Sequence, residues 1–235
     1  MKNVLSVSAD AKTVKGETLG FLTGILYLAP ATTTKWNTCS MAKLAQCDKA
    51  CLYSAGRGAF NSVQQARIAK TVRFFEDRTG FMADLVFSIK ALVRKATKQG
   101  LKPLVRLNGT SDIRWETVGL TVDGIEYANI FDVFPDVQFY DYTKDANRKA
   151  LPSNYDLTFS YSGVEGFQPF VKKAVDNGMR LAVVFRTEAS IPNTFRGIPV
   201  VSGDKSDVRH LDAQGVVVGL YAKGKAKADT TGFVV

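Results

Sequence analysis

The chain has 235 residues, of which 46% are hydrophobic and 23% charged, and 31 Lys and Arg against 22 Asp and Glu give a net charge of +9. This composition excludes disorder and fibrous repeats, because enough apolar surface is available to offset the entropy lost on folding. No apolar run reaches the roughly 18 residues of a membrane span, and the N-terminus lacks the pattern of a signal peptide. We therefore expect a cytoplasmic protein with no membrane partner.

The positive charge is concentrated in the N-terminal part of the chain. Residues 1–105 contain 16 basic and 6 acidic side chains, whereas residues 106–235 contain 15 and 16. Such asymmetry is typical of a surface that faces nucleic acid, phosphate or an acidic protein, and equally of solvated basic helices. No sequence motif of an RNA- or DNA-binding domain accompanies it.

The first elements expected are an arm, a strand and two helices. Residues 1–20 show no clear period and are interpreted as an N-terminal arm with a short strand at 4–7. A buried strand is expected at 24–30, where proline ends it. The first helix, at 60–75, has apolar residues at helical spacing: Val63, Ile68, Val72 and Phe75. The second has a clearer apolar stripe, which runs from Met82 to Ala96 and stops before Gly100.

Short apolar runs, each ending in polar or glycine residues, dominate the rest of the chain. They predict strands at 103–109, 137–143, 156–163, 180–186, 198–204 and 216–222. Helix-like connections at 144–151 and 167–177 favour parallel pairing. The predicted fold class is α/β, a partial (β/α) TIM-like barrel of about six or seven mostly parallel strands. No linker interrupts it, so we expect one barrel-like domain at 21–235.

The three cysteines of the chain are clustered. Cys39, Cys47 and Cys51 follow the spacing C-x7-C-x3-C in a polar loop predicted at 32–58. An odd number of cysteines without a secretion signal speaks against a disulfide framework. Nearby lysines and arginines would lower the thiol pKa and offset thiolate charge. The cluster therefore indicates a metal site.

The number of thiols bears on which metal binds. Structural zinc normally takes four protein ligands, usually with a C-x2-C pair, and neither is present. Three thiolates can hold a 4Fe–4S cluster with one iron open to a small molecule or a non-cysteine ligand. The only histidine, His210, is a candidate fourth ligand. An iron–sulfur cluster is the favoured interpretation, with zinc and a metal-free loop as alternatives.

The predicted strand ends supply further candidate residues. The cysteine loop follows the first long strand, which places it at the carboxyl ends of the strands, where sites of β/α barrels are built. Arg106, Asn108, Arg186 and Asp204 lie at the ends of other predicted strands. Arg106, Arg186 and Lys144 could hold a carboxylate or phosphate through charge-assisted hydrogen bonds. These residues predict a pocket that faces the cysteines.

Several short stretches together resemble the gene product 88 family of phages and plasmids. They are Thr38-Cys39, Cys47, Cys51–Gly56, Val105–Asp112, Phe139–Lys144, Phe159–Ser162, Val201–Arg209 and Gly219–Lys225. The resemblance covers most of the chain from about Lys35 onward. It implies a viral protein of the host cytoplasm with an iron–sulfur site, and it adds Asp112, Lys144, Asp204 and Asp207 to the candidate site residues.

The cysteine loop more distantly resembles that of the radical S-adenosylmethionine enzymes. In that family three cysteines after the first strand of a partial barrel hold a 4Fe–4S cluster, whose open iron chelates S-adenosylmethionine. The spacing here differs from their usual C-x3-C-x2-C. This resemblance implies a 4Fe–4S cluster and makes S-adenosylmethionine a second candidate cofactor.

Two functions of different classes follow from these observations. The first is an iron–sulfur protein that carries out redox or S-adenosylmethionine-dependent chemistry on a small molecule. The second is a binding protein in which metal stabilises the loop, while the basic N-terminal half docks nucleic acid or a host protein. The sequence contains no G-x-S-x-G, H-E-x-x-H or P-loop motif, which disfavours the corresponding hydrolases.

Overall fold

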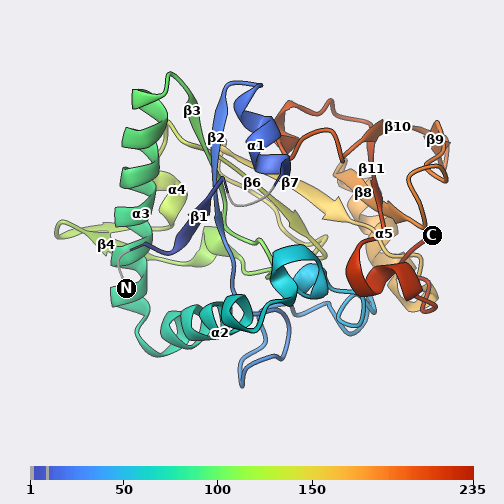
Figure 1. Cartoon of the computed structure of the whole chain (residues 1–235), viewed down its shortest axis with the longest axis horizontal. Helices are drawn as coiled ribbons and strands as arrows, with labels where there is room; N and C mark the ends of the chain where they lie inside the picture. Colours follow the sequence, from blue (N-terminus) through green and yellow to red (C-terminus); the bar gives the residue numbers. More distant parts are fainter. Residues whose placement is uncertain (1–2, 9–10) are drawn as a thin grey trace.

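A sheet of nine strands, in the order β1-β2-β3-β6-β7-β8-β11-β10-β9, organises the molecule (Figure 1). The computed structural model describes residues 3–8 and 11–235. All neighbours from β2 to β10 are parallel. These seven strands are β2 (Phe21–Leu26), β3 (Lys102–Arg106), β6 (Gln138–Thr143), β7 (Tyr155–Ser160), β8 (Arg180–Phe185), β11 (Val217–Tyr221) and β10 (Ile198–Ser202).

Each edge of the sheet carries a short antiparallel strand. β1 (Leu5–Val7) pairs with β2, and β9 (Thr194–Phe195) pairs with β10. Within the described residues β1 and β9 do not pair with each other, so the sheet is open. The predicted α/β fold with mostly parallel strands is confirmed. A closed barrel is not observed, because closure requires the two edge strands to pair.

Helices cover one face of this sheet. α3 (Arg78–Lys98) packs on β2 and β3, and α5 (Gln168–Asp176) packs on β8. Leu157 belongs to the core under α3, and Phe159 to the core under α5. These residues are two apart on β7, so both cores line the same face of the sheet. The predicted helices at 82–96 and 167–177 are therefore confirmed within a few residues.

α2 (Asn61–Glu76) is a helix as predicted, but it buries a different face. Its buried residues are Arg67, Lys70, Thr71 and Phe74, whereas Val63, Ile68, Val72 and Phe75 are only partly buried. The Thr71 hydroxyl donates to the Arg67 carbonyl at 2.9 Å and accepts from the Ala29 backbone at 2.8 Å. This contact attaches α2 to the chain just beyond β2 and turns two cationic side chains inward.

The opposite face of the sheet is covered by α1 (Ala11–Glu17) and by the segment that connects β10 to β11. That segment, residues 203–216, includes the single turn η5 (Arg209–Leu211), which contacts β6 and β7. Val208 joins Phe21, Leu104 and Tyr140 in a small apolar cluster. The connection therefore lies against the sheet face rather than leaving it open to solvent.

The helix predicted at 144–151 is wrong, and the strand predicted at 24–30 lies earlier, as β2. Residues 144–151 form turns instead of a helix. The Asp145 carboxylate accepts from the Asn147 backbone at 2.8 Å, and Ala150 has a positive φ of 51°. Such side-chain-to-backbone bonds compete with helix formation. A short hairpin of β4 (Leu120–Val122) and β5 (Ile125–Tyr127), and the short helix α4 (Ile130–Val133), were not predicted.

The N-terminal arm is partly integrated into the fold. The strand expected at 4–7 is confirmed as β1, and α1 packs on β2. Residues 1–2 and 9–10 of the predicted arm lie outside the described residues. In the part of the chain that the structure describes, no helix is both long enough and apolar enough to cross a membrane.

Candidate functional site

The cysteine loop lies over the carboxyl ends of the central strands. It follows β2, and it is tied to the loop after β3 by a hydrogen bond of 2.8 Å from the Asp112 backbone to the Thr38 carbonyl. The Ser162 hydroxyl, just beyond β7, donates to the Ala45 carbonyl at 2.9 Å. Because parallel strands end at the same edge, these contacts hold the loop against the edge at which sites form in α/β sheets.

All three cysteine side chains are partly buried in this loop. The Cys39 sulfur lies 3.8 Å from the Thr110 carbonyl oxygen, and the Cys47 sulfur lies 3.8 Å from the Ala42 carbonyl oxygen. Cys51 accepts from the Tyr53 backbone at 3.5 Å. A charge on Cys51 raises the pKa of both other thiols, so the three thiols border one region.

Burial raises the pKa of every cysteine, and for Cys39 the value reaches about 12. Two cations act in the opposite direction: Lys144 on Cys47 and Arg67 on Cys51. Cys39 has an acidic neighbour, Asp112, whose charge raises its pKa further. The thiols are therefore electrostatically unequal. Those of Cys47 and Cys51 each have a nearby cation that favours the thiolate.

The sulfur atoms are not drawn together into ligation geometry. Among the residues that the structure describes, no group of three or more His, Cys, Asp or Glu side chains is arranged to hold a metal ion. None of the three cysteines, all within the described residues, forms a disulfide. Metal ligation would therefore require this loop to bring its sulfurs closer to one another.

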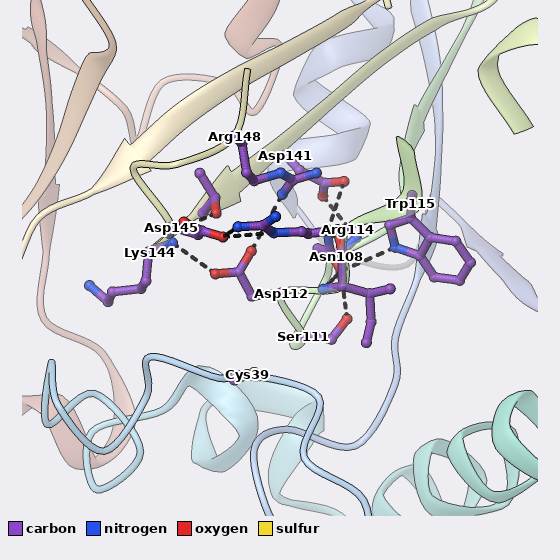
Figure 2. A network of polar contacts seen from close by, with 12 residues as sticks. Cys39, Asn108, Ser111, Asp112, Arg114, Trp115, Asp141, Lys144, Asp145 and Arg148 are labelled. Carbon is purple, nitrogen blue, oxygen red and sulfur yellow. Dashed lines mark hydrogen bonds and ion pairs between the residues drawn. The ribbon is translucent and has the colours of Figure 1, made fainter. Parts of the chain in front are cut away.

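Asp112 and Lys144 link the cysteine loop to the strands (Figure 2). The Asp112 carboxylate accepts from the Lys144 backbone at 2.8 Å and pairs with Arg148 at 3.5 Å. Burial raises the pKa of this carboxyl group. Arg148, whose side chain is fully buried, also pairs with Glu116. In Figure 2 Asp112 is drawn on the side of this network that faces the Cys39 loop, and the charge of Asp112 raises the pKa of Cys39.

The Lys144 ammonium group is buried and faces away from Asp112. It donates to the Ser160 carbonyl at 2.7 Å, to the Ser160 hydroxyl at 3.0 Å and to the Tyr161 carbonyl at 2.9 Å. It also lies 4.7 Å from the centre of the Phe233 ring. Burial lowers the pKa of this lysine to about 8. These hydrogen bonds therefore fix the Lys144 ammonium group in position beside Cys47.

Asn108 has its side chain engaged within its own loop. Its amide oxygen accepts from Ser111, Ile113 and Trp115, and its amide nitrogen donates to the Ile113 carbonyl. Its backbone donates to Asp141 at 2.8 Å. Figure 2 shows this cluster beside the Asp112 network. Asn108 thus shapes the loop after β3.

Arg106 and Asp207 form an ion pair of 3.2 Å on the sheet face that residues 203–216 cover. Tyr140 donates to Asp207 at 2.8 Å.

Arg186 and Asp204 lie at the carboxyl ends of the strands, as the cysteines do, but they contact C-terminal segments. Arg186 is exposed and donates to the Lys227 carbonyl at 3.3 Å, while Asp204 pairs with Lys223 at 2.6 Å.

His210 lies at the other end of the strands from the cysteine loop. Its ring packs edge-on against Phe21, the first residue of β2, with centroids 4.8 Å apart. Its pKa is lowered by burial and by Arg180 and Lys102, which begin β8 and β3. The structure therefore brings Asp112 and Lys144 to the cysteines, and it does not bring His210 there.

Sequence reasoning did not single out two buried cations of α2, of which Arg67 lies beside Cys51. Solvated basic helices were one of the two interpretations of the N-terminal charge, but Arg67 and Lys70 are 7% and 9% exposed. The signal was present as a stripe of Arg67, Lys70, Thr71 and Phe74 at helical spacing. It was overlooked because long charged side chains are seldom buried.

The fold and the loop together define an α/β protein with an open, mostly parallel sheet and a three-cysteine loop at the carboxyl edge of its strands. The chain belongs to the gene product 88 family, whose family model matches residues 4–235. No curated protein and no solved structure matches it.

Proposed function

We propose that this protein binds an iron–sulfur cluster, of the 4Fe–4S type, through Cys39, Cys47 and Cys51. The observation that carries the proposal is the placement of all three partly buried cysteines in one loop that is bonded to the carboxyl ends of the strands. Three thiols that border one buried region form a donor set suited to iron and sulfide. The resemblance to radical S-adenosylmethionine enzymes is limited to this loop and its position after β2.

The charges around the loop fit an anionic metal centre. Thiolate ligands must lose their protons, and burial alone opposes this step for all three cysteines. Lys144 and Arg67 favour the deprotonated forms of Cys47 and Cys51. Cys39 lacks such help and is the thiol whose deprotonation depends most on the metal itself. Binding would also require the turn-rich loop to draw its sulfurs together.

Three protein ligands would leave one position for a small molecule. A 4Fe–4S cluster supplies an open iron and a one-electron couple. Asp112, which pairs with Arg148 and raises the pKa of Cys39, is an acidic group that a ligand on the Cys39 side would meet. S-adenosylmethionine is a candidate for that position, as is another small molecule with a chelating head group.

Iron and acid-labile sulfide measured on anaerobically purified full-length protein test the proposal. We expect a brown protein with about four irons and four sulfides per chain, lost in Cys39→Ser, Cys47→Ser and Cys51→Ser variants. His210→Gln is the matched control and should retain its iron. Stoichiometric zinc without iron, from cells given ample iron, would overturn the proposal, as would full iron content in all three cysteine variants.

Docking of nucleic acid or a host protein through the basic N-terminal half stays a prediction. Several of its cations are engaged within the molecule. Lys35 pairs with Glu76 at 3.0 Å, and Arg73 pairs with Asp77 and Asp84. Salt-dependent retention of the iron-free protein on nucleic acid would support this alternative.

A further inference from the structure

Arg67 is a buried cation, and two of its guanidinium nitrogens lack hydrogen-bond acceptors in the described part of the chain. The residue is 7% exposed, and its Nε and Nη1 atoms are buried with no hydrogen-bond partner in the described part of the chain. No carboxylate pairs with it there. An arginine carries five N–H donors in a fixed fork, and burying such donors unpaired is strongly unfavourable. The guanidinium group therefore has unused capacity to bind an acceptor.

Two aromatic rings and a glycine hold the Arg67 fork in place. The guanidinium carbon lies 4.7 Å from the centre of the Tyr27 ring and 5.5 Å from that of Tyr53. At Gly58, an added Cβ would lie 3.3 Å from Nη1 of Arg67 and 2.8 Å from the Tyr53 carbonyl oxygen. Glycine thus allows the chain after Cys51 to pass close to the fork. The rings orient the group without neutralising its charge.

Lys70 places a second cation one helical turn further along α2. It is 9% exposed, and its ammonium group donates to the Val4 carbonyl at 3.3 Å. Burial and the charge of Arg67 lower its pKa to about 8. Two like charges buried together on one helix face repel each other unless an anion lies between or beside them. Residues i and i+3 on a helix present their side chains on the same face.

The Cys51 thiol adjoins Arg67, close enough that the charge of each group shifts the pKa of the other. Within the described residues, neither Arg67 nor Lys70 forms an ion pair with a carboxylate, and the Arg67 Nε and Nη1 atoms have no hydrogen-bond partner. The single turns η1 (Leu52–Ser54) and η2 (Gly56–Ala59) adjoin Arg67 on the cysteine-loop side, and Leu52 and Phe60 are exposed to solvent.

We propose that Arg67 and Lys70 form a binding subsite for an oxyanion, the carboxylate or phosphate group of a small molecule, next to Cys51. Arg67 would supply a planar two-pronged contact and Lys70 a point charge, as in other carboxylate and phosphate sites. Entry requires η1 and η2 to move aside. The assignment of this subsite to the ligand of the cysteine loop rests on the proposed function. The ability of Arg67 and Lys70 to bind an oxyanion does not depend on the cluster.

Calorimetric titration of the full-length, metal-free, reduced protein with inorganic phosphate tests the subsite. At constant ionic strength we expect saturable binding at one site per chain. Arg67→Gln should weaken binding about tenfold or more, since hydrogen bonds to charged groups contribute roughly 1.5–3 kcal/mol. Arg94→Gln removes an equal charge from the exposed face of α3 and should leave affinity unchanged. Acetate in place of phosphate distinguishes carboxylate from phosphate preference.

Further outcomes separate this proposal from the cluster. Phosphate binding in a protein that never takes up iron would support the subsite and overturn the proposed function. Iron binding without saturable phosphate binding to wild type would overturn the subsite alone. Equal affinity in wild type and Arg67→Gln would also overturn it. If Arg67→Gln does not fold, Lys70→Met provides the same comparison, with weaker phosphate binding expected.

Discussion

Lys144 lies beside Cys47, close enough that the lysine charge lowers the pKa of the thiol. The two residues belong to different parts of the fold. Cys47 lies in the loop after β2, and Lys144 directly follows β6. The ammonium group is held by oxygens of Ser160 and Tyr161. Its position is therefore set by the strands rather than by the cysteine loop.

Removal of that charge should make Cys47 less reactive. In Lys144→Met the pKa of Cys47 rises, because burial then acts without the opposing cation. The rate of Cys47 alkylation in the metal-free protein is followed by peptide mass spectrometry as a function of pH. The midpoint of its increase should lie at higher pH in the variant than in wild type. Lys149→Met, an exposed neighbour, is the control and should leave the profile unchanged. An unchanged Cys47 profile in Lys144→Met would contradict the assignment.

Asp112 should have the opposite effect on Cys39. Its carboxylate charge raises the pKa of this thiol, in addition to the larger effect of burial. Asp112→Asn should therefore lower the pKa of Cys39 and speed its alkylation at a given alkaline pH. The same peptide map measures both changes. Slower alkylation of Cys39 in Asp112→Asn would count against the placement of these two groups.

The two buried lysines should make the stability of the protein rise with pH. The pKa values of Lys70 and Lys144 are about 8 in the folded state, below the ordinary lysine value of 10.5. Between these values the unfolded state binds more protons, so unfolding becomes less favourable as pH increases. From pH 7 to 8.5 we expect a gain of roughly 1 kcal/mol per lysine. Urea unfolding of the metal-free protein at both pH values measures it.

Lys144→Met tests this origin directly, because it should remove the contribution of Lys144, roughly 1 kcal/mol, from the change between the two pH values. The raised pKa values of the three cysteines and of Asp141 act in the opposite direction in both proteins and cancel in this comparison. Lys149→Met should change with pH as wild type does. The same change in wild type and in Lys144→Met would show that the pKa of Lys144 is not lowered in the folded state.

Arg148 should be among the most sensitive positions for stability. Its fully buried side chain pairs with Asp112 and Glu116, whose side chains are also largely buried. Arg148→Met leaves both carboxylates without their cation, which costs about 3–5 kcal/mol for a buried pair. Arg114→Met, which removes an exposed partner of Asp145, should cost about 0–1 kcal/mol. Urea denaturation compares the two, and equal losses would contradict the difference in burial.

Much of the architecture could be predicted from local sequence. The seven parallel strands were expected because short apolar runs bounded by glycine and polar residues have few other stable conformations in a buried sheet. The β4–β5 hairpin was not predicted, although its Asp123-Gly124 dipeptide is a sequence signal of such a turn. Both residues have positive φ, which this dipeptide tolerates. The helix expected at 144–151 does not form, because the Asp145 carboxylate accepts a hydrogen bond from the Asn147 backbone.

The sequence by itself determined the α/β class, the approximate strand positions and the grouping of three cysteines between the first long strand and the first long helix. Only the tertiary structure decided that Lys144 and Asp112 lie beside these cysteines, that His210 lies at the opposite end of the strands, and that Arg67 and Lys70 point inward. Strand formation follows from local hydrophobic patterns, which the sequence displays directly. Side-chain proximity depends on which strand ends meet at one edge and on how α2 is rotated, and a contact as distant as that from Thr71 to Ala29 sets that rotation.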